Sequence, residues 1–239
     1  MLRFYSPDNT DKRMIYAKTA LEKSGYICVE KEENANFIML GVNPDEKLLS
    51  LKKPIFAGNV EEAKGIFDYT KNEAFALKNA YLTAEAALSL AIKSSPLSLI
   101  NSSVLICGFG RIGKALLRYL EPFTRDITIC LRNENAAAAA KSEGARVIGF
   151  NELKNKGLYH FVFNTVPHPV FNEEELKALK KGALLIDLAS FPGGVDEHYA
   201  KKLDINYISA RGLPGKYSPE SAGEIVAQTV INTIDKEGL

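Results

Sequence analysis

The sequence is short of cysteine, of metal-site spacings and of nucleophile motifs, and these shortages exclude several kinds of chemistry. Its three cysteines, Cys28, Cys107 and Cys130, lie far apart and within or beside apolar runs, which suits buried thiols better than disulfides or metal ligands. No Cys/His spacing typical of a metal site, no G-x-S-x-G elbow and no Walker loop occurs. We therefore expect no metal site and no acyl-enzyme chemistry.

Excess charge and long apolar runs are also missing. The 30 basic and 29 acidic residues leave a net charge of +1, which argues against nucleic acid or an anionic membrane surface as a partner. No stretch reaches the roughly 18 apolar residues of a membrane span, and the first residues show no basic segment followed by an apolar run. The 239 residues, 46% of them hydrophobic, predict a globular cytoplasmic protein.

The second half alternates short apolar runs with helical patterns, which is typical of a parallel sheet with crossover helices. Near-continuous hydrophobicity in the apolar runs indicates strands that are covered on both faces. The pattern predicts a doubly wound Rossmann sheet with the strand order 3-2-1-4-5-6. Strands are expected at 104–107, 127–131, 146–148, 161–163, 184–188 and 206–208, and helices at 114–120, 134–143, 173–179, 196–202 and 219–233.

The first part of the chain carries a weaker pattern of the same kind. A long helical pattern over residues 73–93 follows it and ends at Ser94-Ser95-Pro96, because proline stops a helix. We therefore predict an α/β protein of two lobes: a smaller N-terminal substrate lobe with its linker helix at 1–97, and a dinucleotide-binding Rossmann domain at 98–239. In the first lobe, strands are expected at 2–5, 26–29, 37–40 and 55–57, and a helix at 12–23.

A glycine-rich string, Gly108-Phe109-Gly110-Arg111-Ile112-Gly113, directly follows the first strand of the Rossmann pattern and opens a helix. In this context Gly108 permits the tight turn, Gly110 lets the backbone approach a pyrophosphate, and Gly113 allows close helix–strand packing. The N–H groups of the helix start then face the anion. Arg111 is either a further pyrophosphate contact or a solvated loop arginine, and the string as a whole predicts a nucleotide site.

The tip of the second Rossmann strand selects between NADP and NAD. NAD-specific domains place a carboxylate about 20 residues after the glycines, but here the strand ends in Leu131-Arg132-Asn133. Arg132 can pair with a 2′-phosphate through its planar guanidinium. NADP is therefore the predicted cofactor, with Arg132 and Asn133 among its ligands. Glu134 follows one or two positions too late for the ribose, so NAD stays as an alternative.

The loop after the fourth strand is expected to form a wall of the nicotinamide site, because ligands bind beyond the carboxyl ends of strands at the topological switch. This loop contributes Thr165, Val166 and Pro167. His168 follows them and is a candidate general acid or base, since an imidazole near neutrality exchanges the proton that accompanies hydride transfer. A histidine between two prolines is otherwise simply an exposed loop residue.

Two later loops at the same edge, 189–194 and 210–218, are rich in glycine and proline, as expected where backbone approaches a ligand. Ser190 in the first loop is a further candidate catalytic residue. Arg211 in the second loop is a candidate clamp for an acidic substrate, since guanidinium matches carboxylate geometry. A solvated arginine is the alternative for Arg211. Asp187, which ends an apolar strand, is either an active carboxylate or an acceptor for backbone N–H groups of the following loop.

Taken in order, these segments resemble the family formed by the A subunits of dipicolinate synthase. The resemblance covers about residues 75–235, and the ordered set is more specific than any one piece. It implies an NADP-dependent Rossmann-type dehydrogenase that acts with the B subunit of dipicolinate synthase, oxidising dihydrodipicolinate to the dipicolinate stored in bacterial spores. The segments that carry it are 105–113, 164–167, 185–194, 212–215 and 219–227.

Other interpretations remain open beside this one. The linker helix and the glycine loop also resemble D-2-hydroxyacid dehydrogenases and adenosylhomocysteine hydrolases, although the arginine, glutamate and histidine set of the former is not evident in its usual order. A third alternative is a nucleotide-binding protein that serves as a sensor or in assembly without catalysis, which predicts cofactor binding without turnover. A homo-oligomer is expected by default.

Overall fold

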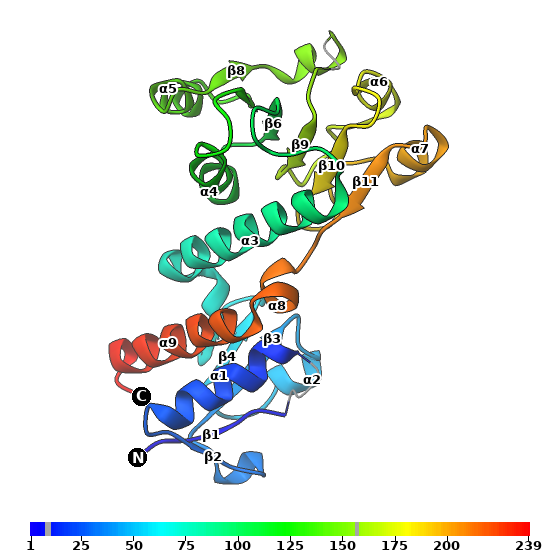
Figure 1. Cartoon of the computed structure of the whole chain (residues 1–239). Coiled ribbons are helices and arrows are strands. Elements are labelled where there is room, and N and C mark those ends of the chain that lie inside the picture. Colours follow the sequence, from blue (N-terminus) through cyan, green and yellow to red (C-terminus); the bar gives the residue numbers. More distant parts are fainter. Residues whose placement is uncertain (8–10, 156–157) are drawn as a thin grey trace. The chain divides into compact units, whose positions relative to one another are not determined.

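The computed structural model describes residues 1–7, 11–155 and 158–239, and the chain divides into two compact units (Figure 1). Unit 1 comprises Met1–Leu82 and Pro214–Leu239, and unit 2 comprises Thr83–Leu213. Each unit contains one parallel β-sheet with helices, so both lobes of the predicted α/β fold are present.

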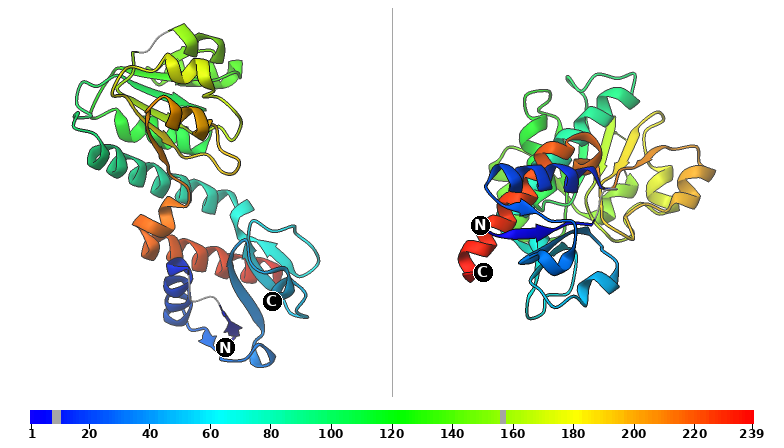
Figure 2. Two further views of the ribbon diagram at one scale, coloured as in Figure 1. Left: turned by 90° about the vertical axis from the view of Figure 1, so that its right-hand side faces the viewer. Right: turned by 90° about the horizontal axis from the view of Figure 1, so that it is seen from below.

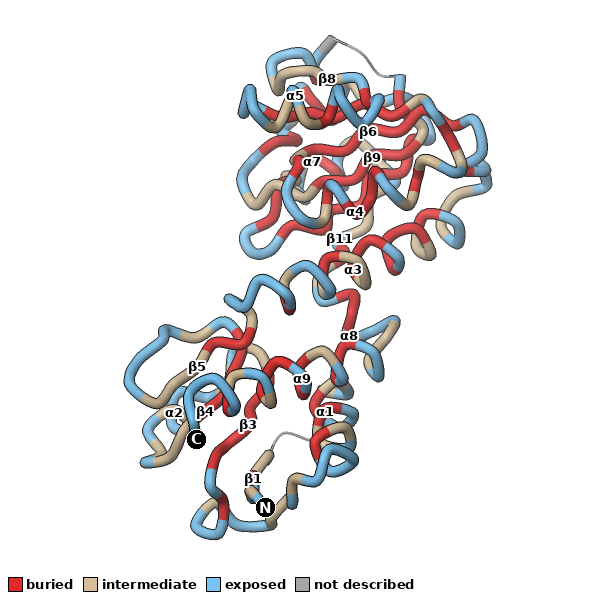
Figure 3. Tube along the Cα trace, turned by 90° about the vertical axis from the view of Figure 1, so that its left-hand side faces the viewer, coloured by how far each residue is buried: buried red, intermediate tan, exposed pale blue. Residues whose placement is uncertain are grey.

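Unit 2 contains the predicted doubly wound sheet. Its strand order is β11-β10-β9-β6-β7-β8, which is the order 3-2-1-4-5-6 expected from the sequence, and all its neighbouring strands pair in parallel. The central strands are fully buried, as Figure 3 shows, because helices cover both faces. The strands are β6 (Val104–Cys107), β7 (Ile127–Cys130), β8 (Arg146–Ile148), β9 (Phe161–Asn164), β10 (Leu184–Asp187) and β11 (Asn206–Ser209).

The helices of unit 2 follow the predicted pattern with one informative difference. The helix after the glycine loop begins at Arg111 rather than at Lys114, so Ile112 and Gly113 of the loop are already helical. This brings the helix start directly to the end of β6. The helical segments are α4 (Arg111–Leu120), α5 (Glu134–Ser142), η3 (Phe150–Asn155), α6 (Glu173–Lys177) and α7 (Glu197–Lys202), with the second half of α3 (Glu73–Ser94).

Unit 1 contains a second parallel sheet, with the order β2-β1-β3-β4-β5. This is the other common doubly wound order, in which the switch point lies between the first and third strands. The sequence did not predict β5, since three residues are too short for a periodic signal. The strands are β1 (Arg3–Tyr5), β2 (Ile27–Cys28), β3 (Phe37–Val42), β4 (Ile55–Gly58) and β5 (Ile66–Asp68).

Two helices lie side by side in unit 1 although they come from opposite ends of the sequence (Figures 1 and 2). They are α1 (Lys12–Lys23) and α9 (Pro219–Glu237). A Cβ atom on Gly223 would meet the Ala17 N atom at 2.7 Å, so only glycine permits this approach. Val226 and Val230 of α9 join the same buried cluster as Phe4 of β1. The remaining helical segments of unit 1 are η1 (Glu32–Asn34), α2 (Glu46–Leu49), η2 (Tyr69–Lys71) and most of α8 (Leu213–Tyr217).

The structural division therefore differs from the predicted one at 1–97 and 98–239. The Rossmann unit begins within α3 and ends at Leu213, while the last helix packs into the other unit. The reason is physical: the apolar face of α9 completes the core that α1 leaves half covered. The amphipathic pattern of a helix shows that it is covered, but not by which sheet.

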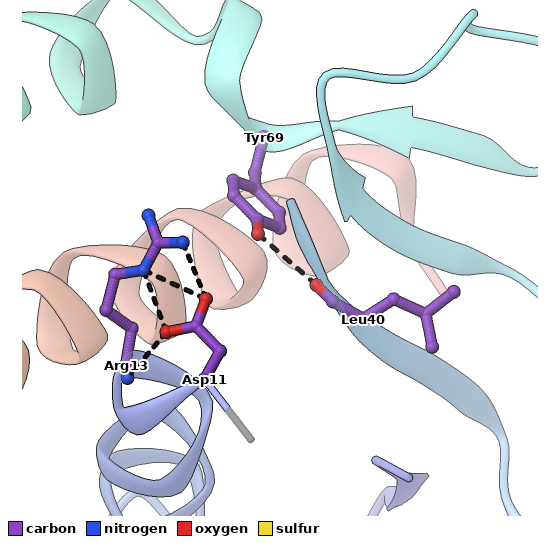
Figure 4. A network of polar contacts seen from close by, with 4 residues as sticks. All are labelled: Asp11, Arg13, Leu40 and Tyr69. Atoms are coloured by element: carbon purple, nitrogen blue, oxygen red, sulfur yellow. Dashed lines mark hydrogen bonds and ion pairs between the residues drawn. The ribbon is translucent and has the colours of Figure 1, made fainter. Parts of the chain in front are cut away.

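The start of α1 carries a compact polar arrangement (Figure 4). Asp11 caps the helix by accepting a hydrogen bond from the Arg13 N–H at 3.0 Å, and the Arg13 guanidinium folds back onto the same carboxylate with a 2.5 Å contact. Burial alone would raise the pKa of Asp11, but the hydrogen bonds and charge of Arg13 outweigh it, and the pKa lies below its usual value. Nearby, the Tyr69 hydroxyl donates to the Leu40 carbonyl oxygen at 3.3 Å.

None of the helices in the described part of the chain combines the length and hydropathy that a bilayer crossing requires. Within the same residues, no three His, Cys, Asp or Glu side chains gather in a way that could hold a metal ion.

Candidate nucleotide and substrate site

The three glycines of the phosphate loop have different structural reasons. Gly108 has φ +93°, and a Cβ there would collide with the Thr165 Oγ1 atom. A Cβ on Gly113 would collide with the Gly108 carbonyl oxygen. Gly110, by contrast, has φ −77° and no heavy atom within 4 Å of a built Cβ, so no contact in the described chain requires glycine there. The free space at Gly110 fits a ligand that must approach the backbone closely, as a pyrophosphate does.

The start of α4 is also open to an anion. Its N-cap is Gly110, which has no side chain to accept hydrogen bonds from the first N–H groups of the helix. Lys114 N donates to the Gly110 carbonyl oxygen at 2.9 Å and closes the first turn, which contains Arg111 and Ile112. The positive end of the helix dipole thus faces the space beside Gly110 without a protein anion as cap. The residues present fit a dinucleotide.

Arg132 and Asn133, predicted to contact the cofactor, follow β7 and have different surroundings. Arg132 is exposed, and its guanidinium carbon lies 5.7 Å from the centre of the Phe150 ring. No carboxylate pairs with it among the described residues. Asn133 is the N-cap of α5, and its Oδ1 atom accepts from Ala136 N at 2.9 Å. Of these two described residues, Arg132 is therefore the one free to receive an anionic group.

Two buried polar residues anchor the loops after β9 and β10. Asn164 and Asp187 are register partners at the ends of these strands, and Asn164 Nδ2 donates to Asp187 Oδ1 at 2.7 Å. Asn164 also bonds both backbone groups of Val166. The Asp187 carboxylate accepts from Ala189 N at 3.2 Å and Gly194 N at 3.1 Å. The second interpretation of Asp187, as an acceptor for backbone N–H groups, is thus the one observed.

Thr165 connects this pair of loops to the phosphate loop. Its N–H and Oγ1 both donate to the Cys107 carbonyl oxygen, at 2.9 and 2.8 Å. Complete burial and then a hydrogen bond with Cys130 raise the pKa of the Cys107 thiol well above its usual value. Both thiols are fully buried, as the sequence predicted. Thr165 thus fixes the loop after β9 against the end of β6.

Ser190 and Arg211, two of the candidate catalytic residues, lie on the loops after β10 and β11. Arg211 Nη2 donates to the Pro192 carbonyl oxygen at 2.8 Å, and its guanidinium carbon lies 5.9 Å from the Phe191 ring centre. A Cβ on Gly193 would meet Arg211 Nη2 at 2.6 Å, so the glycine makes room for the guanidinium. The Arg211 Nε atom is buried with no partner in the described chain, and Ser190 and Phe191 are exposed.

His168, the third candidate catalytic residue, lies elsewhere. It lines a cavity of about 280 Å³ together with Arg132 and Phe150, at the ends of β7 and β8. In the sheet these strands lie on one side of β6, while Ser190 and Arg211 follow β10 and β11 on the other side. The structure therefore brings Ser190 and Arg211 together and places His168 with the predicted cofactor residues. The loop predicted as a nicotinamide wall contributes Val166 to this same cavity.

The other two histidines are remote from these loops. His160 precedes β9 at the opposite edge of the sheet, and its Nδ1 atom accepts from Ser103 N at 3.0 Å. Burial and then the charge of Lys180 lower the pKa of His160. His198 is exposed on α7 and lies edge-on to Tyr199. Sequence reasoning did not single out Asn164 or Phe191, although a polar residue that ends an apolar strand is a usable signal.

A doubly wound sheet whose glycine loop opens a helix onto free space defines a nicotinamide-dinucleotide-binding domain of the oxidoreductase class. Residues 78–198 match the family model described as D-isomer specific 2-hydroxyacid dehydrogenase, NAD binding domain. The match covers half of the chain, and the chain belongs to this family.

Individual relatives agree with this assignment. The A subunit of dipicolinate synthase from Bacillus subtilis is 31% identical over 157 residues, which are 65% of this chain and 52% of the relative. The chain thus spans about half the length of this curated relative. In structure, the A subunit of dipicolinate synthase from Bacillus halodurans has a TM-score of 0.84 at 20% identity, over 97% of both chains. The corresponding dipicolinate synthase structure from Bacillus subtilis has a TM-score of 0.83 at 21% identity, over 98% of this chain and 96% of that one. The resemblance found in the sequence is confirmed, and the structural likeness extends the shared fold to both units.

Proposed function

We propose that the protein is an NADP-dependent dehydrogenase that oxidises dihydrodipicolinate to dipicolinate, acting with the B subunit of dipicolinate synthase. The observation that carries the proposal is the free space beside Gly110 at the uncapped start of α4. The named relative with 31% identity supplies the substrate and the partner. By the same likeness we propose a cytoplasmic protein of sporulating cells.

NADP rather than NAD is favoured by the tip of β7. Arg132 is exposed, lies over Phe150, and has no carboxylate partner in the described chain. A guanidinium held in this way matches the geometry of a phosphate group. The pyrophosphate is assigned to Gly108, Gly110 and the first turn of α4, with Thr165 holding the neighbouring loop. NADP supplies the hydride acceptor when it is bound.

The substrate is assigned to the loops after β10 and β11. Arg211 presents its guanidinium between Pro192 and Phe191, and one of its nitrogens is fixed by the Pro192 carbonyl oxygen. A fixed guanidinium can accept one carboxylate of a dicarboxylate without further ordering. Ser190, exposed on the same loop, is the neighbouring hydrogen-bonding group. Oxidation of the dihydropyridine ring releases one hydride to NADP and one proton, and leaves an aromatic ring.

A 2-hydroxy acid is the second candidate substrate, because the matching family model is that of D-2-hydroxyacid dehydrogenases. Such a substrate also carries a carboxylate for Arg211. The two candidates differ in what they need beside the arginine: the ring needs a flat surface, and Phe191, 84% exposed, offers one.

The test begins with a titration of the purified protein with NADPH and with NADH. Dihydrodipicolinate and NADP are then added, with and without a cognate B subunit, and a D-2-hydroxy acid series with NADP and NAD forms a parallel arm. The proposal expects NADPH binding and the formation of dipicolinate. Turnover of a 2-hydroxy acid alone would replace the substrate, and nucleotide binding without turnover in every arm would indicate a protein that serves as a sensor or in assembly.

A further inference from the structure

His168 lies in a cavity that adjoins the phosphate loop. The cavity of about 280 Å³ is lined by residues that follow three strands: Arg132 after β7, Phe150 after β8, and Val166 and His168 after β9. In the sheet β6 lies between β9 and β7, so the loop after β9 reaches this cavity across the end of β6. A Cβ on Gly108 would meet Val166 Cγ2 at 3.0 Å, which shows that the cavity wall touches the phosphate loop.

The charges around the cavity leave one position undecided. Arg132 contributes a fixed positive charge and has no carboxylate partner in the described chain. Glu175 also lines the cavity, but its Oε2 atom accepts from Asn172 N at 3.1 Å in the capping box of α6, and the residue is only 8% exposed. These two charges cancel formally. Among the described lining residues His168 is the one titratable group left, so its proton decides whether the cavity is neutral or positive.

We propose that His168, in its protonated form, binds the 2′-phosphate of NADP together with Arg132, and so determines which nucleotide is preferred. The inference rests on the proposed binding of the pyrophosphate at Gly108–Gly113. A phosphate monoester carries close to two negative charges near neutrality, and one arginine neutralises only one of them. The imidazolium of His168 supplies the second charge, and Glu175 in the same wall favours that protonated form.

The proposal gives His168 a role in the adenosine half of the nucleotide and not at the hydride-transferring ring. It also explains the position of Phe150: the ring holds the Arg132 guanidinium from one side and leaves its edge for the phosphate. His168 stands on the loop that Asn164 and Thr165 fix to the sheet through hydrogen bonds, so its backbone is held in place before any ligand arrives.

The test measures dissociation constants for NADPH and NADH from pH 6 to pH 8.5 on the unmodified protein and on His168→Asn. Because the chain contains no tryptophan, the fluorescence of the reduced nucleotide is the direct signal. The 2′-phosphate itself titrates near pH 6, so the readout is the ratio of variant to unmodified protein at each pH. Arg132→Ala is the positive control, and His198→Asn, an exposed histidine on α7, is the matched negative control.

We expect His168→Asn to weaken NADPH binding about tenfold at pH 6.5 and less than about twofold at pH 8.5. NADH binding is expected to stay unchanged throughout. Equal losses for both nucleotides would show that His168 contacts the adenine, and a loss of turnover with unchanged NADPH affinity would return it to the reacting ring. Either result overturns the inference, as does an absence of any effect. If the unmodified protein binds neither nucleotide, the proposed function fails instead.

Discussion

The two parallel sheets of this protein begin a helix in the same place and finish it differently. In unit 2, α4 follows the first strand of its sheet and starts on Gly110, which offers no side-chain acceptor. In unit 1, α1 follows β1 and starts on Asp11, whose carboxylate accepts from Arg13 N and is paired with the Arg13 guanidinium. One helix start is left for a ligand anion, while the other is occupied by an anion of the protein itself. A doubly wound sheet thus provides the opportunity for anion binding, and a single capping residue decides whether it is used.

The largest expected effect comes from giving unit 2 the cap that unit 1 has. Gly110→Asp places a carboxylate where the pyrophosphate is assigned, so NADPH and NADH binding should both fall by more than about a hundredfold. The fold should survive, since a Cβ at Gly110 meets nothing within 4 Å, and a capping carboxylate adds up to about 1 kcal/mol. Nucleotide titration and thermal unfolding measure both.

Gly110→Val separates charge from bulk, because it blocks the same space without a carboxylate. Loss of binding is expected here too. Gly113→Ala provides the contrast within the loop: its Cβ would collide with the Gly108 carbonyl oxygen, so unfolding should shift together with binding. Unchanged nucleotide affinity in both Gly110 variants would remove the phosphate-loop assignment.

The second comparison concerns two buried aspartates at strand ends, Asp187 of β10 and Asp68 of β5. Asp68 accepts from Asn59 N, Val60 N and Thr70 N, much as Asp187 accepts from the loop after its own strand. Replacing either by asparagine puts an amide group opposite some of these donors, and we expect a loss of about 2–3 kcal/mol in the free energy of unfolding.

Function should separate the two variants. Only Asp187→Asn is expected to reduce turnover beyond its effect on stability, because Gly193 and Arg211 lie against that carboxylate. Denaturant unfolding and steady-state kinetics at matched folded concentration provide the check. Equal turnover in the two variants would contradict a positioning role for Asp187.

A smaller effect is expected at Arg211 itself. Arg211→Lys keeps the charge but loses the planar fork, so KM for the carboxylate substrate should rise about tenfold. The dissociation constant for NADPH should not change, since Arg211 lies on the far side of β6 from Arg132 in the strand order. A parallel loss of nucleotide affinity would place Arg211 in the cofactor site.

The smallest effect is at the capped helix start of unit 1. The folded-state pKa of Asp11 lies below its ordinary value of 3.8, so its stabilising contribution is present above that value and is lost as pH falls through the folded pKa. Asp11→Asn keeps a capping oxygen but not the ion pair. We expect it to cost about 0.5–1 kcal/mol at pH 7 and nothing at pH 2, where the carboxyl is neutral. A constant difference at both pH values would contradict the ion-pair account.

The sequence was sufficient for the Rossmann sheet, because each strand and each crossover helix is a local pattern. All six strands of unit 2 were predicted within one or two residues, and their order follows from the doubly wound rule. The glycine loop was identified for the same reason: spacing, strand and helix are contiguous.

Long-range packing could not be derived in this way. The periodicity of α9 is evident in the sequence, but its partner α1 lies some 200 residues away, and the close approach at Gly223 leaves no local mark. His168 shows the same limit on a smaller scale. Its loop follows β9, yet the loop turns toward β7 and β8, and the direction of an irregular loop is not encoded by periodicity.

The return of the chain to unit 1 has a consequence for the order of synthesis. Residues 83–213 are one uninterrupted segment, whereas unit 1 needs α9, which is translated after all of unit 2. Until then, the aromatic cluster of Phe4, Phe37 and Phe56 lacks the covering side chains of α9. Unit 2 is therefore able to fold on the ribosome first, while the earlier-made sheet waits with apolar surface exposed, which is a condition that favours aggregation and chaperone binding.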